Sequence, residues 1–206
     1  NHAWRLNIKL GDKYEAQSRV LEAKQLFKCA LTIMKTIGPK REEAMAYGRL
    51  GNVCAKLSKY QKAKEYHEKA LAITIEIGDR GGEGTTYGNL GNVFYSLGEY
   101  QKAKEYQEKA LAIAIEIGDR RTEGTTYGNL GNVFHSLGEY QNAKEYQEKA
   151  LAIEIEIGDR RGEGTRYVNL GNVFYSLSEY QKAKEYYEKA LTILIEIGDR
   201  SEERRV

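Results

Sequence analysis

The sequence contains few of the residues that interrupt helices, cross-link chains or bind metals. Among 206 residues there are one proline, two cysteines and three histidines. Because proline breaks helices, its near absence permits long uninterrupted helical segments. Two cysteines are too few for a disulfide framework, so we expect a reducing, cytoplasmic setting. We expect Cys54 to be a buried thiol and Cys29 to pack in the core or at its boundary. The histidines have no partner at metal-ligand spacing, so we expect neither a metal site nor a cofactor.

An excess of charge of one sign and long apolar runs are also missing. The 32 lysines and arginines nearly balance the 30 acidic residues, which leaves a formal net charge of +2. A nucleic-acid-binding domain normally shows a basic stripe, so we expect no nucleic-acid partner. No run of about eighteen apolar residues occurs, so we expect no membrane span and no membrane partner.

Internal repetition with a period of forty residues dominates the sequence instead. Residues 81–120 and 121–160 differ at only five positions, and residues 161–200 differ from 81–120 at seven. A fixed period of this size indicates an array of supersecondary units rather than one globular core. We predict a single array over residues 1–206, with repeats at about 1–40, 41–80, 81–120, 121–160 and 161–200 and the truncated start of a sixth repeat at 201–206.

Each repeat carries the pattern of two helices joined by a very short turn. Apolar residues with helical spacing predict a first helix over residues 83–97, and Asp79 can cap its N-terminus. A second apolar stripe predicts a helix over residues 100–117. Gly118 is a candidate for a left-handed residue that ends this second helix.

The glycine that recurs inside the first helix requires a structural reason. Gly91 and its equivalents lie in the middle of the predicted helix, where glycine costs about 1 kcal/mol relative to alanine. A cost repeated in every unit implies a gain repeated in every unit. We predict that Gly91 permits close approach of the paired helix at Ala103.

The repeats carry a recurring set of residues at fixed spacing. The set consists of a large residue, a Leu-Gly pair, an aromatic residue and two alanines, which in one repeat are Tyr87, Leu90, Gly91, Phe94, Ala103 and Ala110. This pattern resembles the tetratricopeptide repeat. The forty-residue period exceeds the usual thirty-four, and this long form is similar to the LGN/Pins group and to kinesin light chain arrays. The resemblance implies an all-α fold, a right-handed superhelical solenoid of antiparallel helical hairpins with ten helices in five repeats. It also implies peptide recognition on the concave face.

One surface of the first helices recurs although packing between hairpins does not require it. Stacked hairpins curve, so we expect the first helices to line the concave side. An asparagine amide offers both donors and an acceptor, which suits an extended peptide backbone. The predicted peptide-binding residues are the asparagines Asn52, Asn92, Asn132 and Asn172, the variable neighbours Tyr95, His135 and Tyr175, and the hydroxyl residues Thr85, Thr125, Thr165, Ser96, Ser136 and Ser176.

A structural interpretation of these polar residues stays open beside the functional one. The asparagines could bond between adjacent first helices and stiffen the stack, because buried polar groups normally find internal partners. Arginines near the starts of the first helices could hold acidic ligand groups in bidentate pairs. They could equally pair with the nearby Glu83, Glu123 and Glu163.

No arrangement of residues in the sequence supports catalysis, so we predict that the protein is not an enzyme. The leading hypothesis is a protein–protein interaction scaffold that binds a peptide or protein segment on its concave face. The alternative is a structural spacer or self-associating array whose partner sites lie elsewhere in a longer protein. Weak homo-oligomerisation through terminal helices would then involve the apolar residues Ile193, Leu194, Ile195 and Ile197.

Overall fold

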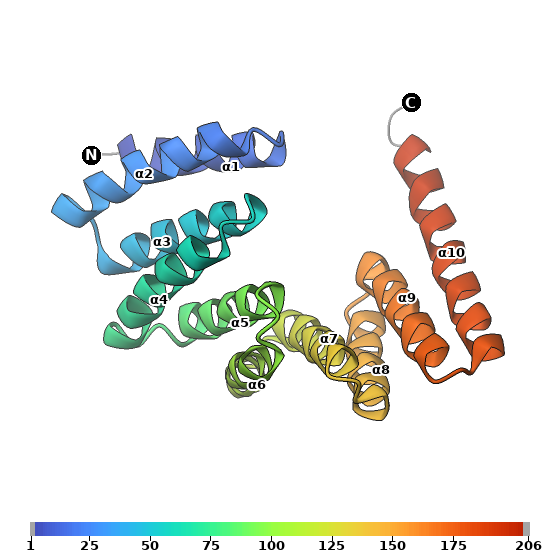
Figure 1. The fold of residues 1–206 in the computed structure, drawn as a ribbon. Helices are drawn as coiled ribbons and strands as arrows, with labels where there is room; N and C mark the ends of the chain where they lie inside the picture. Colours follow the sequence, from blue (N-terminus) through green and yellow to red (C-terminus); the bar gives the residue numbers. More distant parts are fainter. Residues whose placement is uncertain (1–2, 204–206) are drawn as a thin grey trace. The chain divides into compact units, whose positions relative to one another are not determined.

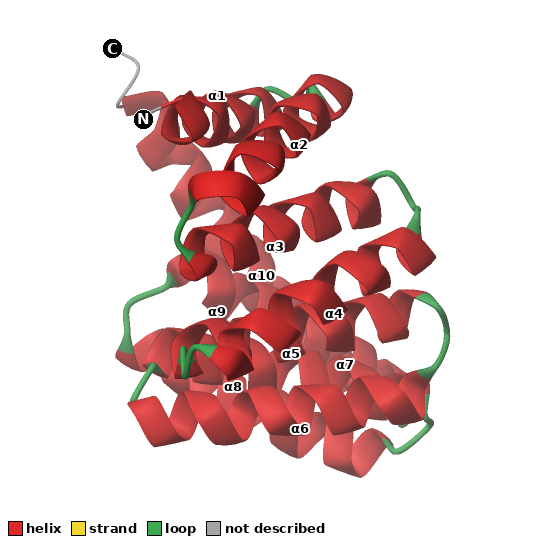
Figure 2. Cartoon of the chain, turned by 90° about the vertical axis from the view of Figure 1, so that its left-hand side faces the viewer, coloured by secondary structure: helices red, strands yellow, loops and turns green. Residues whose placement is uncertain are grey.

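The computed structural model describes residues 3–203, which contain ten helices and no strand (Figures 1 and 2). Short loops join successive helices, as Figure 2 shows. The helices are α1 (Ala3–Ala16), α2 (Val20–Ile37), α3 (Lys40–Lys56), α4 (Tyr60–Glu76), α5 (Arg80–Ser96), α6 (Tyr100–Ile117), α7 (Arg120–Ser136), α8 (Tyr140–Glu156), α9 (Arg160–Ser176) and α10 (Tyr180–Glu203).

The helices group into two compact units, Asn1–Ile113 and Ala114–Val206. In the first unit α1 pairs with α2 and α3 with α4, and the stack continues through contacts of α2 with α3 and of α4 with α5 (Figure 1). In the second unit α7 pairs with α8 and α9 with α10, and α8 contacts α9. Each unit is therefore an all-α solenoid of helical hairpins. A single array over residues 1–206 stays a prediction.

A left-handed residue ends many of the helices, as predicted for Gly118. Gly118 has a φ of +71° and Gly98 a φ of +75°. The amide of Glu99 donates to the carbonyl of Phe94 at 2.9 Å, so the turn satisfies a carbonyl at the helix end. Ser18, Ser58 and Ser178 adopt the same positive φ in other hairpins. This tight turn folds the second helix back onto the first.

Aspartate caps start three of the first helices. The Asp79 carboxylate accepts a hydrogen bond from the Gly82 amide at 3.0 Å, which confirms the predicted cap. The helix begins at Arg80 rather than at the predicted residue 83. Residues 80–82 carry no apolar side chain, so periodicity could not detect this first turn.

The recurring Leu and Ala positions form the packing between paired helices. Leu50, Leu90, Leu130 and Leu170 are fully buried, as are Ala103 and Ala143. Aromatic contacts join the two helices of one hairpin: in the third repeat the Phe94 and Tyr106 ring centroids lie 5.0 Å apart. These contacts confirm the hairpin that the repeat pattern predicts.

The recurring mid-helix glycine does permit close approach, but its partner differs from the prediction. A Cβ added to Gly91 would lie 2.7–2.8 Å from side-chain atoms of Gln107, and Ala103 is not among its nearest neighbours. At Gly51 the same space is taken by His67. The glycine therefore admits a large side chain from the second helix, and Gln107 rather than the predicted Ala103 provides its nearest atoms.

One prediction about the cysteines is corrected: Cys54 is buried as expected, but Cys29 is exposed. Helix α10 continues through Gly198 to Glu203. The start of a sixth repeat at residues 201–206 stays a prediction. Glycine tolerates the helical as well as the left-handed conformation, so the residue type alone does not impose a turn. Residues 204–206 of the predicted sixth repeat lie outside the described residues.

Candidate functional site

The predicted row of asparagines lies on the first helices, but most members are already bonded within their own hairpin. The Oδ1 atoms of Asn92 and Asn132 accept hydrogen bonds at 2.8 Å from Gln107 and Gln147, respectively. The Asn172 Oδ1 accepts one from the Tyr187 hydroxyl at the same distance. The interpretation that asparagines bond between adjacent first helices is therefore wrong. The mid-helix glycine lets a donor on the second helix approach closely enough to bond these three asparagines.

Two asparagines in the first unit differ from these. Asn52 on α3 and Asn89 on α5 make no side-chain hydrogen bond to any residue that the structure describes. Both line a cleft of about 420 Å³ between α3 and α5, and both also line a second cleft of about 360 Å³. We call these two connected clefts the α3/α5 groove. Sequence reasoning singled out Asn52 but missed Asn89, although asparagine recurs there as Asn129 and Asn169.

The lining of the larger cleft is apolar at its base and charged at its rim. Ala44, Met45 and Gly48 contribute from α3. Thr86 donates its hydroxyl hydrogen to the Gly82 carbonyl at 2.7 Å, so the side chain leaves its methyl group for contacts. The rim carries two ion pairs, one joining Arg41 Nε to Asp79 at 3.0 Å and one joining Arg49 to Asp12.

The smaller cleft has a buried imidazole at its wall. His67 lines it beside Asn52, Asn89 and Asn92. Burial lowers the pKa of His67 to about 4, so the ring is neutral near pH 7. No residue that the structure describes makes a hydrogen bond to its Nδ1 atom. The groove therefore combines amide groups and apolar surface with charged side chains that are paired in the Arg41–Asp79, Arg49–Asp12 and Lys56–Glu15 ion pairs.

The variable residues next to the asparagines pack on the start of their own second helices. The Tyr95 ring lies 5.4 Å from that of Tyr100, and the His135 ring lies 5.3 Å from that of Tyr140. The His135 Nε2 also lies 2.9 Å from the Ser176 hydroxyl, which links α7 to α9. The Tyr95 side chain is exposed and the His135 side chain is half-buried.

The hydroxyl residues of the predicted site bond mainly to their own helices. Each of these threonines and two of the serines donate to the carbonyl four residues earlier, at 2.9–3.0 Å. These residues are Thr85, Thr125, Thr165, Ser96 and Ser176. Ser136 is half-buried on α7. Their hydroxyl hydrogens are therefore committed, and only an acceptor oxygen is left for a ligand.

The equivalent groove between α7 and α9 in the second unit is filled. Arg166 is only 9% exposed, and its Nη1 donates to Gln147 Oε1 at 3.3 Å. A Cβ on Gly128 would overlap the Arg166 guanidinium. Burial lowers the pKa of Arg166, while the charge of the buried Glu154 opposes that change. The repeat pattern alone does not show that Arg166 lies on a covered face of its helix.

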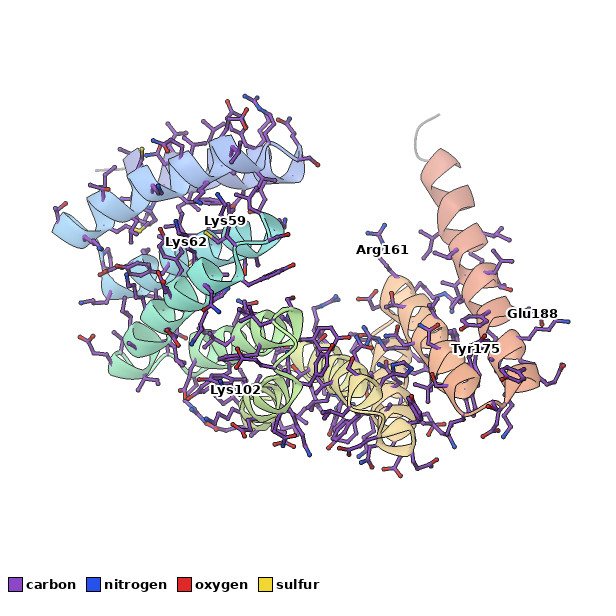
Figure 3. The ribbon with its side chains drawn as sticks, viewed as in Figure 1. Lys59, Lys62, Lys102, Arg161, Tyr175 and Glu188 are labelled. Carbon is purple, nitrogen blue, oxygen red and sulfur yellow. The ribbon has the colours of Figure 1, made fainter. Side chains whose placement is uncertain are left out.

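The other arginines at the helix starts pair with neighbouring carboxylates. Arg80, Arg120 and Arg160 each contact the glutamate three residues later, at 2.5–2.7 Å. Arg121 contacts Asp159 at 3.0 Å. Mutual pairing is thus confirmed for these arginines. Arg161 projects from the start of α9 (Figure 3).

A third cleft lies on the outer side of the last hairpin. It has a volume of about 350 Å³ and is lined by Tyr175, Tyr180, Tyr187 and Leu191 with charged residues at its edge. Figure 3 labels Tyr175 on α9 and Glu188 on α10 at this place. Among the residues described, no cluster of His, Cys, Asp or Glu could hold a metal ion. No described helix is long and apolar enough to cross a membrane.

Comparison with known proteins identifies the repeat. The tetratricopeptide repeat family model matches residues 4–76, 42–116 and 122–196. No curated protein sequence matches the chain significantly.

Several solved structures share the fold. BtubC (BKLC) from P. vanneervenii is 24% identical, with a TM-score of 0.81 over 92% of this chain and 78% of that chain. A putative kinesin light chain from Podosopora anserina with nearly identical TPR-like repeats is 19% identical, with a TM-score of 0.76 over 96% of this chain and 98% of that chain. The Rap conjugation gene regulator of plasmid pLS20, in complex with the Phr* peptide, is 18% identical, with a TM-score of 0.80 over 95% and 54%. With helical hairpins in both units and family matches over most of its length, the chain belongs to the tetratricopeptide repeat family.

Proposed function

We propose that the protein is a non-catalytic interaction scaffold that binds an extended peptide or protein segment along its first helices. The observation that carries this proposal is the pair of unbonded amides, Asn52 and Asn89, that line both clefts of the α3/α5 groove. Each amide can donate to a carbonyl and accept from an N–H of a peptide backbone. The Rap regulator with a similar fold is described with a bound peptide, which favours the same class of ligand.

Under this proposal the remaining asparagines of the row can bond a ligand only through their Nδ2 groups. The Oδ1 atoms of Asn92, Asn132 and Asn172 accept hydrogen bonds from within the hairpin. Their Nδ2 groups donate no hydrogen bond to the residues that the structure describes. They are therefore suited to donate to ligand carbonyl groups. The exposed Tyr95 and Tyr175 would supply apolar contact beside them.

The proposal is tested with a display library of random linear dodecapeptides selected on the whole chain. A selected peptide should bind the Asn52→Ala/Asn89→Ala variant at least tenfold more weakly, since each lost hydrogen bond contributes about 0.5–1.5 kcal/mol. The control is Asn142→Ala, an exposed asparagine at the start of α8. Equal affinity of both variants, or no selectable peptide, would refute the proposal.

A second candidate function, self-association, is favoured by the outer face of α10. Leu194 is 58% exposed there, whereas the equivalent Glu154 on α8 is 4% exposed because α9 covers it. The adjoining cleft, lined by Tyr187 and Leu191, extends the same apolar surface. A second copy of the chain could cover this face as α9 covers α8.

A further inference from the structure

The two grooves between neighbouring first helices lie at equivalent repeat positions but differ in content. In the α3/α5 groove a Cβ added to Gly48 would meet no atom within 4 Å. In the α7/α9 groove the equivalent Gly128 lies directly under the Arg166 guanidinium. The residue that corresponds to Arg166 two repeats earlier is Thr86. One repeat position therefore separates an open groove from a filled one.

Arg166 is held in the filled groove by residues of α8. Its Nη1 donates to Gln147 Oε1, and the negative charge of Glu154 acts on it. Glu154 is itself a departure from the repeat pattern, since the equivalent residues are Thr74 and Ala114. The two departures occur at the same junction between repeats. A buried guanidinium thus has a matching buried carboxylate nearby, which limits the cost of burying its charge.

The open groove has the opposite character. Thr86 is small, and its hydroxyl is bonded to the Gly82 carbonyl, so its methyl group remains for contacts. Ala44 and Met45 extend this apolar lining from α3. The unbonded amides of Asn52 and Asn89 line the same cleft. The arrangement combines space for a side chain with hydrogen-bonding groups for a backbone.

We propose that this repeat position selects the ligand side chain. Thr86 leaves the α3/α5 groove open to an apolar side chain of leucine size, carried by an extended peptide. Arg166 fills the α7/α9 groove and excludes such a side chain. The inference rests on the proposed peptide-binding function and specifies which part of the surface accepts which residue.

The test uses two blocked peptides, acetyl-Gly-Leu-Gly-amide and acetyl-Gly-Glu-Gly-amide, titrated into the isotopically labelled full chain and followed by amide chemical shifts. The leucine peptide should shift the signals of Gly48, Asn52 and Asn89 and leave Gly128 unaffected. It should bind at least tenfold more strongly than the glutamate peptide, because the apolar lining rewards burial of the leucine side chain.

Three variants exchange the character of the grooves. Thr86→Arg places a guanidinium over Gly48, and the double variant Thr74→Glu/Thr86→Arg adds the carboxylate that accompanies Arg166. The double variant should weaken leucine-peptide binding at least tenfold while keeping the helical circular dichroism of the wild type. Arg166→Thr should make the Gly128 signal respond to the leucine peptide.

The control is Thr192→Arg. Thr192 is an exposed threonine on α10, a second helix, and it makes a similar backbone hydrogen bond to the carbonyl of Glu188. This variant should bind like the wild type. Unchanged affinity in the folded Thr74→Glu/Thr86→Arg variant, a wild-type response at Gly128, or no response to the leucine peptide at Gly48 each overturns the inference. A dodecapeptide that loses affinity with Asn52→Ala/Asn89→Ala but not with Thr74→Glu/Thr86→Arg keeps the proposed function and overturns only this selection rule.

Discussion

His67 shows how one residue changes the physical chemistry of a repeat. Its side chain is 1% exposed and occupies the space above Gly51 that glutamine fills above Gly91. Gln107 uses its amide there to bond Asn92, whereas no residue that the structure describes bonds the Nδ1 of His67. Burial favours the neutral form of an imidazole in this place, because a positive charge is costly to remove from water.

Replacing His67 by glutamine should therefore remove a pH dependence of stability. The pKa of His67 is about 4 in the folded chain and 6.5 when unperturbed. Between these values the unfolded chain binds more protons, so the free energy of unfolding falls as the pH drops from about 6.5 to 4. The total loss is on the order of 3 kcal/mol. Urea unfolding at pH 7.5 and 4.5 should show this loss in the wild type and much less of it in His67→Gln.

The matched control for this measurement is His135→Tyr. His135 is half-buried, and tyrosine occupies its position as Tyr95 and Tyr175 in neighbouring repeats. This variant keeps His67, so it should still lose stability between pH 7.5 and 4.5. An identical pH dependence in His67→Gln and the wild type would show that His67 does not resist protonation.

Gly48 and Gly128 offer a second comparison at single residues. In Gly48→Ala the new Cβ meets open space, so helix propensity should stabilise the chain by about 0.5–1 kcal/mol. In Gly128→Ala the Cβ overlaps Arg166, so the gain should be absent or reversed. Chemical denaturation measures both, and combining Gly128→Ala with Arg166→Thr should restore the gain. Equal effects of the two alanine variants would contradict the difference between the grooves.

At the scale of the helix, the capping aspartates set where the first helices begin. The Asp119 carboxylate accepts hydrogen bonds from the Thr122 hydroxyl at 2.7 Å and from the Thr122 amide at 3.0 Å. These bonds lower the pKa of Asp119. The stabilisation is therefore present above the unfolded-state pKa and is lost as the pH falls through the lowered one.

Removing this cap should cost about 1 kcal/mol at pH 7. Asp119→Ala leaves the first amides of α7 without a side-chain acceptor, and losses of about 0.5–2 kcal/mol are typical for such caps. Lys59 precedes α4 without making any side-chain cap bond, so Lys59→Ala is the control and should change the unfolding free energy little. If both variants lost the same stability, the hydrogen bonds to Thr122 would not account for the effect.

The helices also show what a repeating pattern can and cannot predict. The span predicted for residues 100–117 matches α6, because its apolar stripe reaches both ends of the helix. The start of α5 was misplaced because Arg80–Gly82 has no apolar residue. The continuation of α10 through Gly198 was also missed. Glycine permits both a turn and a helix, and the choice depends on surrounding contacts rather than on local sequence.

At the scale of the whole molecule, the exposed face of α10 leads to a prediction about self-association. The average mass of the wild type in sedimentation equilibrium should rise with concentration, and Leu194→Glu should reduce that rise by placing a charge on the apolar face. Ile155→Glu is the control. Ile155 is also exposed, at 53%, but it lies on α8 rather than on the apolar face of α10. A mass that stays constant with concentration would exclude self-association as a function of this chain.

The sequence by itself determined the repeat, its two helices, the glycine gap and the tetratricopeptide family, because period, apolar spacing and caps are local properties of the chain. Only the tertiary structure decided which polar groups are left for a ligand. Asn92 and Asn52 occupy the same repeat position, yet Asn92 is bonded to Gln107 while Asn52 lines an open groove. Thr86 and Arg166 likewise share a position, but one leaves space and the other fills it. The sequence shows that His67 stands in the place of Gln107 and Arg166 in the place of Thr86. Only the contacts between helices show which polar groups these changes leave unbonded and which groove they fill.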